Sequence, residues 1–219
     1  MIVLAASAAM GQQDANLQRV LNQMDASAAK FEDLQADIAV DNYTAVVQDH
    51  EMEKGMTAFR RVAGSMEMVT ILDKGQPGER DLLYKNGALS FYQPGQKQET
   101  IFSAGANKAE YDSLLATGFG ATGKDLAAAW TVTLQGMENI GGTPTATLDL
   151  VSKQANIRNN FSHLTIWIDP ARDISLKQIM VQPDGDSRTV TYSNIRYNAH
   201  LPASLFNLHL AAGTQVQHR

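Results

Sequence analysis

The alternation of apolar and polar residues between positions 187 and 198 is the clearest hydrophobic pattern in the chain. Two pairs of apolar residues alternate with polar neighbours, the second pair one residue out of phase with the first: Val190 and Tyr192, then Ile195 and Tyr197. A strand that changes phase bends there, usually at a bulge, so we expect one at Ser193-Asn194. Pro202 ends the pattern because proline cannot donate to a sheet, and an apolar cluster follows at 204–206. This predicts a curved sheet around an apolar interior.

The N-terminal part of the chain begins with a helical period and then changes to a strand period. Apolar residues fall three or four apart between Asp14 and Phe31, which predicts an amphipathic helix with Asp14 as its cap. A period of two predicts strands at about 34–47, 51–62 and 65–73. Four of the nine methionines lie at even positions in the last two: Met52, Met56, Met66 and Met68. They are interpreted either as core filling or as a soft lining for a ligand of variable shape.

Residues 81–93 contain the clearest hairpin signal. Asn86-Gly87 lies between alternating apolar residues and favours a two-residue primed turn, which fixes the register of the two strands. On one face, this register pairs Tyr84 with Leu89 and Leu82 with Phe91. On the other face, it pairs Leu83 with Ser90 and Asp81 with Tyr92. One face of the hairpin is therefore expected to be wholly apolar.

The rest of the chain predicts two short helices followed by more hairpins. Asn107 with Glu110, and Thr122 with Asp125, have the spacing of helix caps. Further strands are expected at about 99–102, 130–140, 145–151, 161–168 and 174–182. Because no repeat or linker divides the sequence, we expect one domain of α+β class. It is mainly antiparallel, with about ten or eleven strands, an N-terminal helix and short central helices.

Composition excludes several classes of protein. The 219 residues are 44% hydrophobic and carry a net charge of −5 without long charge runs, which argues against nucleic-acid binding. The absence of cysteine excludes disulfides, thiolate metal sites and a lipid-modified cysteine. Residues 1–11 are apolar and end in small residues, so we interpret them as the remnant of a signal peptide, with residues 12–219 as the mature domain; the alternative is a frayed apolar N-terminal tail. We expect an exported, soluble protein without a membrane span, and a monomer.

No motif indicates a reaction. Gly118, Gly120 and Gly123 match a dinucleotide-binding pattern, but they follow a predicted helix rather than a strand, so a joint between two helices is the better interpretation. The five histidines are scattered without metal-ligand spacing, and no G-x-S-x-G is present. We therefore expect no enzyme activity, no metal and no cofactor. Apolar strand faces outnumber the helices available to cover them, which favours a hydrophobic-ligand cavity.

Several segments, in order, resemble the LolA family of periplasmic lipoprotein carriers. They are Asp81–Gln98, Leu114-Leu115 in the central helical segment, Phe161–Asp169, and Ile174–Val216 with its asparagine before a proline, its Leu-Phe pair and a final short strand. The resemblance implies an incomplete antiparallel β-barrel with a helical lid and no catalytic residues. It also implies acyl chains under that lid, carried from an inner-membrane ABC-type releasing complex to an outer-membrane receptor.

The resemblance and the apolar patterns together define a candidate lipid site. The expected cavity-lining residues are Met66, Met68, Leu82, Tyr84, Leu89, Phe91, Leu114, Leu115, Trp130, Leu164, Ile166 and Phe206. The family has a functional arginine in an Arg-Pro context on an early strand, which corresponds to Arg61; here Arg60 precedes it and Val62 replaces the proline. Arg61 is either a latch for the lid or a solvated strand residue.

Three functions remain open from the sequence. The first is a carrier, in which an empty cavity closes on its own lining and ligand binding must displace those contacts. A periplasmic lipid-sensing regulatory subunit would use the same cavity without shuttling. An exported enzyme on a β scaffold would need a polar cluster in that cavity.

Overall fold

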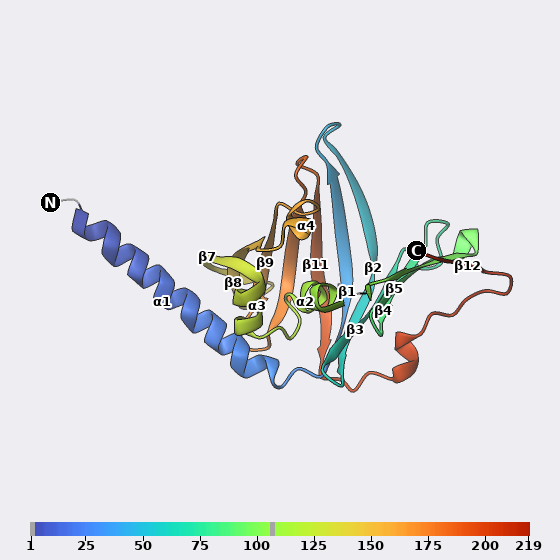
Figure 1. Ribbon diagram of the computed structural model, residues 1–219, viewed down its shortest axis with the longest axis horizontal. Coiled ribbons are helices and arrows are strands. Elements are labelled where there is room, and N and C mark those ends of the chain that lie inside the picture. The colour runs from blue at the N-terminus through green and yellow to red at the C-terminus, as the bar shows by residue number, and fades with distance from the viewer. Residues whose placement is uncertain (1–2, 106–107) are drawn as a thin grey trace. The chain divides into compact units, whose positions relative to one another are not determined.

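A computed structural model describes residues 3–105 and 108–219 (Figure 1). Its helices are α1 (Val3–Ala28), α2 (Lys108–Ala116), α3 (Gly123–Ala129) and α4 (Ala155–Arg158), with 3-10 turns η1 (Pro94–Gln96) and η3 (Ala203–Phe206). Its strands are β1 (Asp33–Thr44), β2 (Asp49–Val62), β3 (Ser65–Leu72), β4 (Arg80–Lys85), β5 (Ala88–Gln93), β6 (Gln98–Ser103), β7 (Trp130–Ile140), β8 (Thr143–Ser152), β9 (His163–Asp169), β10 (Ile174–Val181), β11 (Ser187–Tyr197) and β12 (Gln215–His218).

The strands within the described residues form one open sheet. Their hydrogen-bonded order is β12-β6-β5-β4-β3-β2-β1-β11-β10-β9-β8-β7, so β12 and β7 are the two edges. The hairpin pairs run antiparallel, whereas β12 runs parallel to β6. The expected α+β class and unclosed, mainly antiparallel sheet are confirmed. The described part of the chain has twelve strands rather than ten or eleven, because β12 pairs although all four of its residues are exposed.

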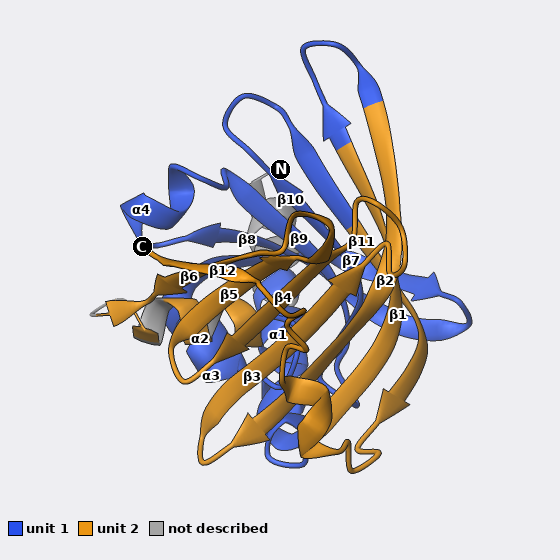
Figure 2. Ribbon diagram, turned by 90° about the vertical axis from the view of Figure 1, so that its right-hand side faces the viewer, with its two compact units in different colours: residues 1–30, 43–49, 117–189 blue, residues 31–42, 50–116, 190–219 orange. Residues whose placement is uncertain are grey.

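The chain divides into two compact units (Figure 2). Unit 1 comprises residues 1–30, 43–49 and 117–189, and unit 2 comprises residues 31–42, 50–116 and 190–219. Each unit draws on several separated segments of the chain, because long strands such as β1 and β11 pass from one unit into the other.

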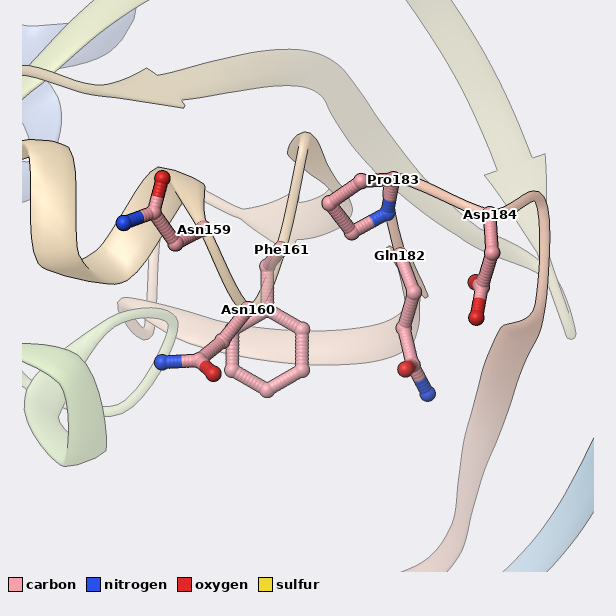
Figure 3. Close-up of a pocket in the computed structure, with 6 residues that line it drawn as sticks. All are labelled: Asn159, Asn160, Phe161, Gln182, Pro183 and Asp184. Atoms are coloured by element: carbon pink, nitrogen blue, oxygen red, sulfur yellow. The ribbon is translucent and has the colours of Figure 1, made fainter.

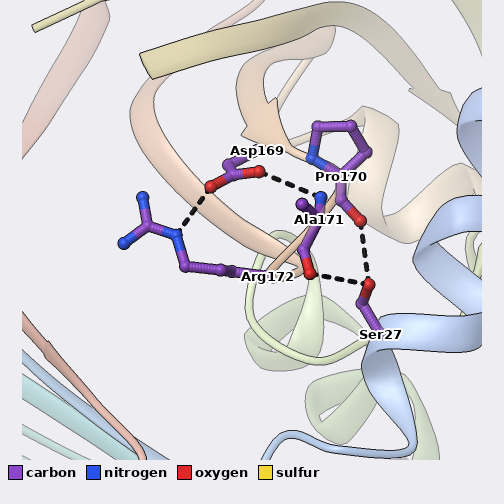
Figure 4. Close-up of polar contacts among 5 residues, drawn as sticks. All are labelled: Ser27, Asp169, Pro170, Ala171 and Arg172. Atoms are coloured by element: carbon purple, nitrogen blue, oxygen red, sulfur yellow. Dashed lines mark hydrogen bonds and ion pairs between the residues drawn. The ribbon is translucent and has the colours of Figure 1, made fainter. Parts of the chain in front are cut away.

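Within unit 1, the C-terminal end of helix α1 is hydrogen-bonded to the turn between β9 and β10 (Figure 4). The buried Ser27 hydroxyl lies 3.0 Å from the Pro170 carbonyl oxygen and 2.9 Å from that of Ala171, to which it donates. Asp169 shapes the same turn, accepting hydrogen bonds from the Ala171 amide at 2.9 Å and from the Arg172 Nε at 2.6 Å. The turn therefore presents its carbonyl groups to the end of α1.

Helix α1 begins earlier than its amphipathic pattern predicts. The sequence places the N-terminus at Asp14, but the backbone is helical from Val3, so Asp14 lies inside the helix. The residues before it include several alanines, and alanine has the highest intrinsic helix propensity, so the helix continues through them. The predicted cap at Asp14 is wrong for this reason.

Helix α3 is capped as predicted and packs closely on α1. The Thr122 hydroxyl accepts a hydrogen bond from the Asp125 amide at 3.0 Å. A Cβ atom at Gly123 would lie 2.3 Å from the Leu21 carbonyl oxygen, so only glycine permits this approach of the two helices. The residues 118–122 join α2 to α3, as expected for the glycine pattern. The other predicted capping pair is Asn107 with Glu110. Asn107 and the side chain of Glu110 lie outside the described residues.

In unit 2, the hairpin formed by β4 and β5 has the predicted register. Asn86 and Gly87 both have positive φ, 54° and 75°, as a type I′ turn requires. The β11 strand changes phase where expected, because Val190 is buried before the change and Ile195 is half-buried after it. Asn194 has φ of 50° at that point, and its side-chain amide donates to the Asp37 carboxylate at 2.7 Å.

The four even-numbered methionines do not share one face of the sheet. The β2–β3 turn at Ala63-Gly64 pairs Met56 with Ile71 and Met68 with Phe59, so even positions on one strand oppose odd positions on the next. Met66 and Met68 therefore lie on the opposite face from Met56, and Met52 is exposed. The interpretation of all four as one soft lining is wrong, because the register across the turn inverts their parity.

Candidate functional site

Six of the predicted lining residues lie on one face of β3, β4 and β5. The backbone pairs are Met68 with Tyr84, Tyr84 with Leu89, and Leu82 with Phe91, and directly opposed residues point to the same side of a sheet. Met66 lies two positions before Met68 on the same side. We call this side the α2 face, because helix α2 packs against β3 there.

The α2 face combines buried anchors with partly exposed apolar side chains. Tyr84 and Met66 are 1% and 5% exposed, whereas four others remain half-buried: Met68, Leu82, Leu89 and Phe91. Phe102, which was not among the predicted lining residues, pairs with Leu89 and is 41% exposed. In β6 the alternation is ambiguous because Ile101 and Phe102 are both apolar, so only the register shows which one continues this face.

Helix α2 is held on this face by polar contacts. The Tyr84 hydroxyl donates to Asp112 Oδ1 at 2.6 Å, and Lys108 forms an ion pair with Asp112 and a hydrogen bond to Ser65 Oγ at 3.4 Å. Burial raises the pKa of Tyr84 above its usual value of 10, and the hydrogen bond to Asp112 raises it further. Leu114 and Leu115, which were predicted to line the cavity, are half-buried on the same helix. Within unit 2, α2 thus covers part of an apolar face and is fixed at one polar point.

Phe206 does not belong to this group. It is fully buried against Ala58 and Val69, which lie on the opposite side of β2 and β3. The Arg60 guanidinium lies 4.3 Å from the centre of its ring. We call this side the C-terminal face, because η3 and the residues around it cover it. The sequence grouped Phe206 with the lining residues because an apolar cluster after a strand does not indicate which face of the sheet it covers.

Trp130, Leu164 and Ile166 lie in unit 1. They are buried, with exposed fractions of 3%, 4% and 0%. Leu164 pairs with Leu150 and Ile166 with Leu148, so both belong to an apolar layer of β8 and β9. Trp130 begins β7, the strand that α3 packs against. These three residues form part of the core of unit 1.

Arg61 and Arg60 point to opposite sides of β2. Arg61 is directly opposite Met66, so it lies on the α2 face, with its guanidinium 5.9 Å from the centre of the Phe31 ring. Arg60 pairs with Glu67 on the C-terminal face, with Nε 2.7 Å from Glu67 Oε2. Of the two arginines, the one singled out from the sequence is thus the one on the apolar face.

Each of the two units contains a cavity formed by its own described residues. One of about 570 Å³ lies between the end of α4 and the β10–β11 turn of unit 1 (Figure 3). Polar and apolar groups contribute about equally to its lining, which consists of Asn159, Asn160, Phe161, Gln182, Pro183 and Asp184. The other, of about 430 Å³, lies on the C-terminal face of unit 2 and is lined by β3, β4 and β5 together with residues 204–211.

The described residues contain neither a metal cluster nor a helical membrane span. Over residues 3–105 and 108–219, no three His, Cys, Asp or Glu side chains are grouped so as to hold a metal ion. In the same ranges, no helix combines the length and the apolar character needed to cross a membrane.

Comparisons with known proteins show similarity in structure rather than in sequence. No protein-family model matches the chain, and no curated protein matches it. The Pseudomonas aeruginosa MucA/MucB complex matches with a TM-score of 0.52 and 12% identity, over 89% of this chain and 61% of that chain. A DUF1329 family protein from Desulfovibrio piger matches with a TM-score of 0.50 and 12% identity, over 89% and 97%. The LolA superfamily protein NE2245 from Nitrosomonas europaea matches with a TM-score of 0.43 and 13% identity, over 87% and 97%.

The fold is LolA-like. The resemblance inferred from the sequence is therefore confirmed for the architecture. At 12% identity the similarities concern the LolA-like fold alone, and this chain spans 61% of the chain that it matches in the MucA/MucB complex.

Proposed function

We propose that this protein binds the acyl chains of lipids or lipoproteins on the α2 face and carries them through the periplasm, from the inner to the outer membrane. The observation that supports the proposal best is the row of half-buried apolar side chains on this face, from Met68 to Phe91. The opposite face of the same strands is partly covered by Phe206 and its neighbours. A row of adjacent, partly exposed apolar side chains is what a site for a hydrocarbon chain requires.

The contacts of α2 suggest how binding and release are balanced. Burying about 14 methylenes at about 0.8 kcal/mol each contributes roughly 11 kcal/mol, which would make release slow. In the empty protein, α2, which carries Leu114 and Leu115, covers part of the face, so an acyl chain would have to displace the helix. Loss of these contacts lowers the net affinity. The Tyr84–Asp112 hydrogen bond keeps the helix nearby, and we assign Arg61, on the same face, to latching it.

The carrier function includes export and two membrane partners. We propose that residues 1–11 are the remnant of a signal peptide and that residues 12–219 are the periplasmic carrier domain. An inner-membrane ABC-type complex would load the cargo and an outer-membrane receptor would accept it. The protein itself would perform no reaction. The LolA-like fold supports this assignment.

A lipid-sensing regulatory subunit is the second candidate. Its support is the similarity to MucB in the complex with MucA, the structure compared above with a TM-score of 0.52. Such a subunit would use the same α2 face, but it would hold a protein partner and change its affinity for that partner when lipid binds. A carrier transfers its lipid to acceptor membranes, whereas a sensor retains it.

The test is mass spectrometry of the lipids that co-purify with the protein from native periplasm. Wild type is compared with Leu82→Glu, which places a charge on the α2 face, and with Leu210→Glu, a matched change at a position 42% exposed outside it. We expect diacyl or triacyl species with wild type and Leu210→Glu, and their loss from Leu82→Glu. Equal lipid retention by folded Leu82→Glu would contradict the proposal.

A further inference from the structure

The C-terminal face of unit 2 contains a cavity that the proposed acyl site does not use. This cavity, of about 430 Å³, lies between β3–β5 and residues 204–211. Its volume is within the range of small-molecule sites. The cavity lies on the opposite side of the strands from the α2 face. An acyl chain bound on the α2 face would therefore not fill the cavity.

The wall of the cavity is mainly apolar. Val69 and Ile71 of β3 line one side, and Leu205 and Leu208 from the C-terminal segment line the other. The segment is held over the sheet by hydrogen bonds: the Ala211 amide donates to the Tyr92 hydroxyl at 3.0 Å, and Lys85 Nζ donates to the Phe206 carbonyl oxygen at 3.2 Å. The cavity is therefore a bounded space between two fixed elements.

Asp81 is the polar group that this space leaves unsatisfied. It lines the cavity, is 9% exposed, and its Oδ1 atom is buried without a hydrogen-bond partner among the described residues. A buried carboxylate oxygen without a partner carries a desolvation cost that a donor from a ligand would offset. Burial is also the main cause that raises the pKa of Asp81 to about 6, with Glu79 raising it further and Lys74 lowering it.

We propose that this cavity binds a small organic ammonium compound with an apolar body, its ammonium group pairing with Asp81 and its body lying against Val69, Ile71 and Leu205. The charges around the site fit a cation. Asp81 and Glu79 provide two carboxylates against the single ammonium of Lys74, and the other titratable groups are Tyr92 and His209. Carboxylates accept hydrogen bonds only, so the ligand must donate. An ammonium group donates and also neutralises the buried charge.

Calorimetric titration with 2-phenylethylamine at pH 7.5 tests the site. Two probes of the same shape are its controls: 2-phenylethanol, which is neutral, and 3-phenylpropanoate, which is anionic. We expect saturable binding of the amine. The alcohol can donate a hydrogen bond but cannot neutralise the carboxylate, and the anion cannot donate and is repelled by it, so both should bind at least about tenfold more weakly. The absence of saturable amine binding, or equal binding of the alcohol, would overturn the proposal.

Variants locate the binding. Asp81→Asn keeps the shape of the side chain and removes its charge, and it should weaken amine binding at least about tenfold. Asp14→Asn, at an exposed position of α1, should leave binding unchanged. If folded Asp81→Asn binds the amine as wild type does, the assignment is wrong. If it does not fold, the three probes on wild type still decide the question.

Two further measurements separate this site from the acyl site. Leu82→Glu lies on the α2 face, so it should abolish lipid retention and leave amine binding intact. Lowering the pH from 7.5 to 5 should weaken amine binding, because Asp81, with its pKa of about 6, becomes protonated. Amine binding that is lost in Leu82→Glu, or that is unchanged at pH 5, would contradict a site at Asp81.

Discussion

Asp81 and Tyr84 show how one strand serves two different environments. Both lie on β4, but Asp81 faces the C-terminal face and Tyr84 faces the α2 face. Tyr84 has a polar partner in Asp112, whereas Asp81 Oδ1 has none among the described residues. The alternation of β4 predicts that the two residues point to opposite sides. It does not predict what covers each residue, because helix α2 and the C-terminal segment come from distant parts of the chain.

The raised pKa of Asp81 predicts how its charge affects stability. Burial raises this pKa from 3.8 to about 6, so the folded state binds the proton more tightly than the unfolded state does. The stabilising contribution of the protonated group is therefore complete below about pH 4 and is lost as the pH rises through 6. Between pH 4 and pH 7.5, we therefore expect the free energy of unfolding of Asp81→Asn to rise by about 1–2 kcal/mol relative to that of wild type.

Urea denaturation of both proteins at pH 4 and pH 7.5 measures this difference. Asp14→Asn, at an exposed aspartate, should follow wild type at both values. If the stability difference between Asp81→Asn and wild type does not change with pH, burial of the ionised Asp81 carboxylate does not destabilise the folded protein.

The Tyr84 hydroxyl should hold α2 on the sheet. Tyr84→Phe removes the hydrogen bond to Asp112 with little change in packing, which should cost about 1 kcal/mol. Because the bond joins α2 to β4, we expect the loss to appear as faster hydrogen exchange of the α2 amides. Tyr111→Phe removes a hydroxyl from a side chain of α2 that is 45% exposed, and it should leave this exchange unchanged. Equal exchange in Tyr84→Phe and wild type would mean that other contacts hold the helix.

At the scale of elements, the packing of α1 on α3 depends on one glycine. In Gly123→Ala, the new Cβ would meet the Leu21 carbonyl oxygen at 2.3 Å, and backbone on both sides leaves no side chain to move aside. We expect a loss of about 1–3 kcal/mol in the free energy of unfolding, together with faster exchange in α1 and α3. Gly78→Ala, where nothing lies within 4 Å of the new atom, is the control and should be nearly neutral. A neutral Gly123→Ala in thermal and urea denaturation would show that the two helices can separate without cost.

The elements that the sequence predicted well are those with local signals. The Asn86-Gly87 turn fixes its own register, and Thr122 with Asp125 forms a cap across three residues, so both were predicted correctly. The methionine set and Phe206 depend on how separate segments meet. The two-residue turn at Ala63-Gly64 changes which positions share a face, and only the folded chain shows which face η3 covers. Such placements come from tertiary packing and are not contained in local periodicity.

At the scale of the molecule, an open sheet with an apolar face is the feature from which the function is inferred. Among the described residues, β12 and β7 are the edge strands of the sheet. In unit 2, the C-terminal segment partly covers one side of β3–β5, while the other side carries half-buried apolar residues. The sequence predicted the apolar face through the hairpin register. It did not predict that the lining residues divide between two compact units, because strand patterns do not show which segments form a unit.

Photo-crosslinking with a diazirine-bearing fatty acid tests the central claim most directly. The probe is bound to the delipidated protein and irradiated, and the labelled residues are mapped by mass spectrometry. Binding of acyl chains on the α2 face predicts labels on Met68, Leu82, Leu89 and Phe91, and their loss in Leu82→Glu but not in Leu210→Glu. Labels confined to Leu205 and Leu208 on the C-terminal face, or the same labels on the α2 face in folded Leu82→Glu, would contradict it.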